Sequence, residues 1–317
     1  MYEWLWNIER YSGNKSSTFT RYESIYRNYI EDTNLGYIKL SDLKKIPIQR
    51  YYKDLLDKGK GYSAIANANK LLNKFLRYAV EEGYILRNPL TGLKLPKENE
   101  TDITKVNKIE VFKEEEIKKL VNSIGDEKLR YLVLFAFFTG ARKGEILALT
   151  NSDIKDGYVT INKSVRRIKV FDDEDNYHYE IKVTRPKSKT SNRNVPIPKP
   201  LEKELKKLNL LVKKEKIKLG PAYTEHNLLF PSLTGNYIDA STLMKSWKRA
   251  LKKAEIPYRK FHALRHTYAT TLLEKGASLI EVSRLLGHST VKTTEIYAHP
   301  SLESKKKTVE RLNEIEL

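Results

Sequence analysis

Five side chains in this sequence have the types and the order of a site that binds a phosphate and attacks it. They are Arg142, His262, Arg265, His288 and Tyr297. Arginine suits a phosphodiester because its planar guanidinium binds two phosphate oxygens at once and stays charged at working pH. Donors already in place for the charge that develops during attack supply a large part of catalysis. Two arginines, two histidines and a tyrosine hydroxyl in this order predict phosphoryl transfer to a protein nucleophile.

Arg142 is expected at the start of a helix, because a break at Gly140 precedes it and a helical segment over residues 143–149 follows. The N-terminus of a helix is a favourable place for a phosphate. Glu145 is positioned to brace the turn. An isolated arginine of this kind would usually be an ordinary surface residue, but the residues that follow it favour a functional role.

His262 and Arg265 are three residues apart in a helix predicted to run to about Glu274, so they share a face. His262 and His266 also have the i,i+4 spacing of zinc-binding helices. We expect no metal, because Arg265 would lie beside the dication, no glutamate separates the histidines and no third ligand suggests itself. For His266, a structural hydrogen bond and a role in the site remain equally open.

His288 follows a helix whose two ends are marked in the sequence. Ser278 and Glu281 form a capping box at its start. Gly287 ends it and leaves His288 at an exposed corner. A lone histidine after a helix usually has no function, and His288, nine residues before Tyr297, would be an ordinary residue on this evidence alone.

Tyr297 lies in residues 290–299, which predict a short helix capped by Ser289 or Thr290. It is one of 20 tyrosines, so its position and not its type makes it a candidate. A phenol with a pKa of ~10 is a weak nucleophile unless a base or a positive field assists it. The two arginines and a histidine would supply that field.

The order Arg…His-x-x-Arg…His…Tyr, with the boxes T-G-A-R and L-L-G-H-S, resembles the tyrosine recombinase (phage integrase) family over essentially the whole chain. The resemblance implies a site-specific DNA recombinase of the kind found in phages and conjugative transposons. Tyr297 would form a 3′-phosphotyrosine and free a 5′-hydroxyl. The bond energy is retained in that intermediate, so rejoining would need no ATP, metal or other cofactor. The resemblance gives catalytic roles to Arg142, His262, Arg265, His288 and Tyr297.

In the family, a lysine on a β-hairpin protonates the leaving 5′-oxygen. The matching segment here is residues 185–196, and the resemblance favours Lys187 as this general acid. Lys189 is the alternative, because the length of this loop varies. The third interpretation is that this segment is a basic loop that faces DNA and has no catalytic role.

The sequence departs from the family pattern at Ala263, where the family usually has aspartate. This affects how His262 is oriented but removes none of the proposed catalytic groups. Many relatives also carry an N-terminal arm-binding domain. The core-binding pattern begins at once here, so we expect that domain to be absent or removed.

The elements that must position these residues fall into two expected domains. Residues 1–95 predict a helical core-binding (DNA-binding) domain, and the polar, aperiodic residues 96–109 predict a linker. Residues 110–317 predict the catalytic domain. The expected fold class is mainly α with a small antiparallel β-sheet (α+β).

Four segments of the catalytic domain have clear patterns. Residues 129–138 are apolar on nearly all sides and predict a buried helix. Residues 158–170 and 178–183 alternate around an acidic turn and predict a hairpin. Residues 194–198 predict an edge strand, because proline cannot occupy the centre of a sheet. Residues 201–219 predict an amphipathic, lysine-rich helix.

Composition agrees with a protein that binds a polyanion. The chain of 317 residues has 59 Lys+Arg against 40 Asp+Glu, a formal net charge of +19, and is basic on both sides of residue 99. Alternatively, the excess of basic residues reflects a proteome that is generally rich in lysine. The absence of cysteine excludes disulfides, thiolate zinc sites and cysteine nucleophiles. No apolar run approaches the ~20 residues of a membrane span, and no signal peptide is visible. We therefore expect a soluble, cytoplasmic protein.

The resemblance also implies partners. Double-stranded DNA with attachment sites would be the substrate, held between the two domains by a homotetramer, and accessory DNA-bending proteins are a further class of partner. After the basic residues 305–307, an apolar stripe of Val309, Leu312 and Ile315 predicts a terminal helix. The resemblance implies that this helix docks on a neighbouring subunit, and docking on its own domain is the alternative. A type IB topoisomerase and a non-catalytic DNA-binding regulator are the rival functions.

Overall fold

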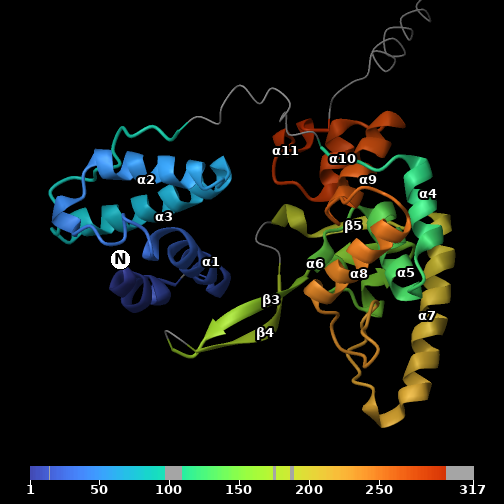
Figure 1. Ribbon diagram of the computed structural model, residues 1–317. Coiled ribbons are helices and arrows are strands. Elements are labelled where there is room, and N and C mark those ends of the chain that lie inside the picture. Colours follow the sequence, from blue (N-terminus) through green and yellow to red (C-terminus); the bar gives the residue numbers. More distant parts are fainter. Residues whose placement is uncertain (14, 97–108, 174–175, 186–188, 298–317) are drawn as a thin grey trace, which may run out of the picture. The chain divides into compact units, whose positions relative to one another are not determined.

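The computed structural model describes residues 1–13, 15–96, 109–173, 176–185 and 189–297 (Figure 1). The chain forms two compact units. The first combines Met1–Val106 with Ile168–Glu180, and the second combines Asn107–Arg167 with Ile181–Leu317. The terminal helix expected over residues 303–317 lies outside the described residues.

The first unit is built from helices around one apolar core. Its helical segments are η1 (Trp4–Ile8), η2 (Glu9–Tyr11), α1 (Ser16–Tyr26), η3 (Arg27–Glu31), η4 (Leu40–Asp42), α2 (Lys45–Asp57) and α3 (Tyr62–Glu81). The apolar residues of α3, from Ile65 to Ala79, recur at helical spacing and are buried as one stripe. The helical character expected for this part of the chain is confirmed.

The tip of a β-hairpin completes this core. The hairpin is formed by β3 (Ser164–Phe171) and β4 (Tyr177–Thr184). Phe171 packs edge-on against Trp6 at a centroid distance of 5.0 Å and against Phe19 at 5.5 Å. Lys169 Nζ lies 3.5 Å from Oε1 of the buried Glu23. The hairpin was expected, but its packing against the N-terminal helices was not.

The second unit has a three-stranded antiparallel sheet in the order β1-β2-β5. Its strands are β1 (Ile154–Lys155), β2 (Tyr158–Ile161) and β5 (Arg193–Pro196). β5 is an edge strand, as predicted from Pro196 and Pro198 for residues 194–198. The single strand expected over residues 158–170 is wrong, because the chain divides there into β2, which pairs with β1 and β5, and β3, which pairs with β4.

Helices surround that sheet. They are α4 (Glu114–Ser123), α5 (Glu127–Thr139), α6 (Lys143–Ile146), α7 (Lys199–Leu219), α8 (Ala240–Lys253), α9 (Ala263–Glu274), α10 (Leu279–Leu286) and α11 (Lys292–Glu295), with short 3-10 turns η6 (Asn151–Asp153), η7 (Lys189–Ser191) and η8 (Gly220–Ala222). α5 is the central helix, since it contacts α4, α6, α7, α8 and α9. The predictions of a buried helix at α5, of a long amphipathic helix at α7 and of a mainly α fold with small antiparallel sheets are confirmed.

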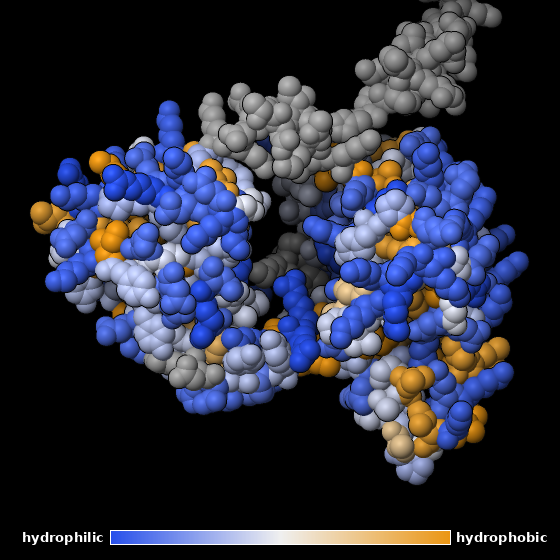
Figure 2. Space-filling view, viewed as in Figure 1, coloured by the Kyte–Doolittle hydropathy of each residue, from blue (hydrophilic) through white to orange (hydrophobic). Residues whose placement is uncertain are grey.

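The visible surface of both units is mostly hydrophilic (Figure 2). This agrees with the formal net charge of +19. Within the part of the chain that the structure describes, no helix is long and apolar enough to cross a membrane.

Candidate active site

The turn after α5 sets the position of Arg142. Gly140 ends α5 with a φ of +61°, and a Cβ at this position would collide with the ring of Tyr268. Only glycine adopts that backbone readily and leaves room for the ring. Arg142 then becomes the N-cap of α6. α6 ends at Ile146 and not at Leu149 as expected, because the chain leaves the helix to pair Leu149 with Leu229.

Glu145 holds this turn through charged hydrogen bonds. Its carboxylate accepts from the backbone N–H of Arg142 at 2.8 Å and from Arg142 Nη1 at 2.9 Å. It also accepts from Arg193 Nη2 at 2.8 Å and Nη1 at 3.2 Å. Burial by itself would raise the pKa of Glu145, but the hydrogen bonds and positive charge of Arg193 and Arg142 outweigh it and lower the pKa to about 2. The brace expected from the sequence is confirmed.

Arg193 was missed as a site residue. Its side chain is buried, and its Nε donates to the carbonyl of Leu285 at 2.7 Å. It therefore ties β5 to α6 and to the end of α10. The signal lay in the alternation of β5, where Arg193 and the buried Val195 share a face. The predicted edge strand began at Asn194, so Arg193 fell outside it.

Arg265 is buried at 2% exposure and uses its guanidinium to join two backbone segments. Nη1 donates to the carbonyl of Gly140 and Nη2 to that of Leu286, each at 2.7 Å. Burial, followed by the positive charges of Arg142 and Arg193, lowers the pKa of Arg265 to about 9, so it remains charged at neutral pH. Among the described residues, no carboxylate is hydrogen-bonded to it. A buried cation in this state attracts an anion.

His262 and His288 lie around that buried charge. His262 is the N-cap of α9, and not within the helix as expected. His288 follows α10, and its Nδ1 is 2.7 Å from Oγ1 of the buried Thr294. Desolvation, followed by neighbouring positive groups that include Arg265 and Arg142, lowers the pKa of both histidines to about 4. Both are therefore neutral at pH 7 and can donate one hydrogen bond to a phosphate.

Tyr297 follows α11, whose N-cap is Val291 and not Ser289 or Thr290 as expected. Its ring is 8% exposed and packs with an apolar cluster that includes Val282 and Leu286. Burial raises the pKa of Tyr297, and the charges of Arg265 and Arg142 act against that rise. Its Oη lies 2.8 Å from Nδ1 of His266.

The two histidines with i,i+4 spacing contact each other. The rings of His262 and His266 meet edge-on, with centroids 4.7 Å apart. Over the described ranges of the chain, no group of three or more His, Cys, Asp or Glu side chains is arranged to hold a metal ion. His266 is engaged by Tyr297 instead.

Two lysines, Lys187 and Lys189, are the candidates for the general acid. Lys187 lies outside the described residues. Lys189 begins the turn η7, which leads into β5. The choice between them as general acid stays a prediction. Beside this segment, a cleft of about 340 Å³ reaches His288 and is lined by Thr190, Asn192, Arg193, Asn194, Arg284, Leu285, Gly287 and His288.

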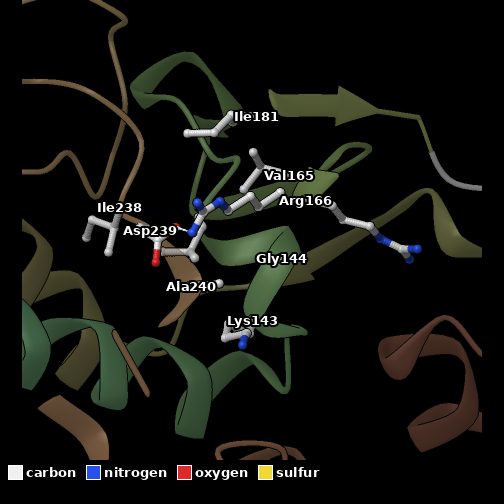
Figure 3. A pocket seen from close by; sticks show the side chains of 10 residues that line it. Lys143, Gly144, Val165, Arg166, Ile181, Ile238, Asp239 and Ala240 are labelled. Atoms are coloured by element: carbon white, nitrogen blue, oxygen red, sulfur yellow. Dashed lines mark hydrogen bonds and ion pairs between the residues drawn. The ribbon is translucent and has the colours of Figure 1, made fainter. Parts of the chain in front are cut away.

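α6, which begins directly after Arg142, packs closely on β3 beside the pocket drawn in Figure 3. A Cβ on Gly144 would lie 2.6 Å from Oγ of Ser164 and 2.8 Å from the carbonyl oxygen of Val165. Glycine is thus required for this approach. A pocket of only about 30 Å³ remains between α6, the base of β3 and the start of α8, with Lys143, Val165, Ile238 and Asp239 among its lining residues.

The comparisons with known proteins agree with this arrangement. The family model described as "Phage integrase family" matches residues 110–304. A protein of Caldanaerobacter subterraneus named tyrosine recombinase XerC-like is 41% identical over 99% of this chain and 82% of its own length.

Two solved structures share the fold. The Tn1549 transposon integrase in complex with circular intermediate DNA matches with a TM-score of 0.72 at 20% identity, covering 96% of this chain and 97% of that one. A lambda integrase tetramer bound to a Holliday junction matches with a TM-score of 0.64 at 20% identity, covering 93% of this chain and 75% of that one.

Proposed function

The chain belongs to the phage integrase family of tyrosine recombinases, and we propose that Tyr297 is the nucleophile with which it cleaves and rejoins DNA. The observation that carries this proposal is the meeting of three distant segments. Arg265 in α9 donates to Gly140, two residues before Arg142, and to Leu286, which packs in the same apolar cluster as Tyr297. The charges of Arg265 and Arg142 also act against the rise in the pKa of Tyr297. Two fixed cations beside a buried phenol suit attack on a phosphodiester.

In this proposal the scissile phosphate occupies the space between Tyr297 and the two arginines. Arg142, whose side chain is 39% exposed, keeps access to a ligand while Glu145 orients it. Arg265 supplies a buried positive charge, and the neutral His262 and His288 add hydrogen bonds to non-bridging oxygens. These donors are held by the fold before DNA arrives, so they need no rearrangement as charge develops.

The reaction exchanges one phosphodiester for another. The Tyr297 oxygen bonds to phosphorus, the bond to the 5′-oxygen breaks, and a 3′-phosphotyrosine and a 5′-hydroxyl result. Lys187, or Lys189 in its place, protonates the leaving oxygen. Rejoining is the same sequence in reverse with a 5′-hydroxyl as nucleophile, so the reaction consumes no ATP and needs no cofactor.

The substrate is double-stranded DNA carrying attachment sites. We propose a homotetramer on two duplexes, with both basic units on DNA and with accessory DNA-bending proteins at some sites. The lambda integrase tetramer on a Holliday junction has the same fold and supports this assembly by analogy. The Tn1549 integrase supports a mobile genetic element as the source of the sites.

A recombination assay tests this function. Two plasmid-borne attachment sites, taken from the DNA that flanks the gene, are incubated with the protein in excess EDTA and without nucleotide. We expect recombinant products from paired sites and none from a plasmid that lacks them. Relaxation of the site-free supercoiled plasmid would favour a topoisomerase, and binding without any strand cleavage would favour a regulator.

A further inference from the structure

Resting on the proposed role of Tyr297, we propose that His266 is a catalytic residue that takes the phenolic proton of Tyr297 during attack and returns it during rejoining. Among the described residues, none of the other four residues identified from the sequence is hydrogen-bonded to the Tyr297 hydroxyl, whereas His266 is. Removing the phenolic proton matters, because a neutral phenol is a poor nucleophile and Tyr297 is buried away from bulk water.

The geometry meets the first requirement for a general base. His266 Nδ1 and Tyr297 Oη are 2.8 Å apart, within the hydrogen-bond distance over which a proton is transferred. The two rings lie 5.4 Å apart between centroids at an angle of 50°. His266 directly follows Arg265 in α9, so one turn of helix carries both a cation of the site and the proposed base.

The other histidines of the site are engaged elsewhere. Nδ1 of His288 contacts Thr294. His262 meets the ring of His266 edge-on. Among the described residues, His266 is the side chain hydrogen-bonded to the Tyr297 hydroxyl.

The protonation states of His266 and Tyr297 also favour transfer of the proton from the tyrosine to the histidine. Burial, followed by the positive charge of Arg265, lowers the pKa of His266, and Glu110 acts against this change. His266 is therefore neutral at neutral pH, with an unshared pair available on Nδ1. Burial raises the pKa of Tyr297, so its proton stays on the phenol until attack begins.

The step balances. As the Tyr297 oxygen bonds to phosphorus, its O–H bond breaks and the proton passes to Nδ1, which makes His266 an imidazolium. The bond from phosphorus to the 5′-oxygen breaks, and that oxygen receives its own proton from the lysine general acid. In rejoining, the 5′-hydroxyl attacks phosphorus and gives its proton back to the neutral lysine, the phosphotyrosine bond breaks, and the imidazolium returns its proton to the phenolate.

The test separates proton transfer from simple positioning. Single-turnover cleavage of a nicked suicide substrate is measured at saturating protein for the wild type, His266→Ala and His266→Asn. Asparagine can place a polar atom near the position of Nδ1 but cannot accept the proton. We expect both variants to bind DNA normally and to cleave about 10²–10⁴-fold more slowly, the usual contribution of a general base. His226→Ala, a histidine that contacts Asn236 away from the site, is the matched control and should cleave normally.

A second experiment replaces the nucleophile by a more acidic one. Replacing Tyr297 by difluorotyrosine gives a more acidic phenol that depends less on a base. We expect it to restore most of the cleavage lost in His266→Ala and in His266→Asn. Wild-type cleavage by His266→Asn, or no rescue by difluorotyrosine in either variant, would overturn the proposal. His266→Asn carries the test if His266→Ala does not fold. Mapping the wild-type adduct to a residue other than Tyr297 would instead refute the proposed nucleophile.

Discussion

At the scale of single residues, Glu145 organises the site although it contacts no substrate. It holds the exposed Arg142 and the buried Arg193 with one carboxylate. A buried ion pair gains little over apolar packing, but removing one member leaves an unpaired buried charge. Arg142 and Arg193 thus share one negative partner.

Glu145→Ala should therefore destabilise the second unit by about 3–5 kcal/mol, the usual cost of breaking a buried pair. Because the pKa of Glu145 is lowered to about 2 from 4.5, its contribution should be complete above pH 4.5 and lost as the pH falls towards 2. Urea unfolding at pH 7 measures the first effect. Glu202→Ala, which breaks an exposed pair with Lys206, is the control and should change stability little. An equal loss in both variants would contradict the role of Glu145.

At the scale of elements, the close packing of α6 on β3 fixes the position of Arg142, the N-cap of α6. Gly144→Ala should push α6 away from Ser164 and Val165 and displace the arginine. A displacement near 1 Å commonly costs about 10²-fold in rate. Cleavage of a suicide substrate should fall by that order while DNA binding persists.

Gly125→Ala is the control for that measurement. Its Cβ would approach nothing more closely than Lys253 Nζ at 3.9 Å. Normal cleavage by Gly144→Ala would mean that the α6–β3 packing does not position Arg142.

The hairpin tip is the second element with a testable role. Phe171→Ala removes a buried ring from between Trp6 and Phe19 and should destabilise the first unit by about 3–5 kcal/mol. Limited proteolysis with identification of the cut sites reports which unit opens. Val183→Ala, on the same hairpin but 41% exposed, should leave the digestion pattern unchanged. Cleavage confined to the second unit would show that the tip does not support the N-terminal helices.

The elements differ in how far the sequence could predict them. The stripe of α3, the end of α5 at Gly140 and the capping box of Ser278 and Glu281 follow from neighbouring residues, so local spacing revealed them. Contacts between distant residues left no such pattern. The pairs Arg193–Glu145, Phe171–Trp6 and His266–Tyr297 depend on tertiary packing that periodicity does not encode. The order of the site residues was still informative, because the resemblance to a family supplied what spacing could not.

At the scale of the whole molecule, the net charge of +19 is spread over both halves of the sequence. If both units bind one duplex, the affinity of the full chain should fall more steeply with salt than that of residues 110–317 alone. Each additional phosphate neutralised adds ~0.9 to the log–log slope. Titrations over a series of salt concentrations give both slopes, and equal slopes would argue against binding by both units.

DNA cleavage by this protein should depend on one oxygen atom, the hydroxyl of Tyr297. Tyr297→Phe removes that oxygen and keeps the ring that packs beside Val282 and Leu286. The variant and the wild type are incubated with a nicked suicide substrate, denatured and analysed for covalent protein–DNA adducts, and the modified peptide is identified by mass spectrometry. The account predicts a wild-type adduct at Tyr297 and none in the variant, with DNA binding unchanged. An adduct that persists in Tyr297→Phe, or that maps to another residue in the wild type, would contradict it.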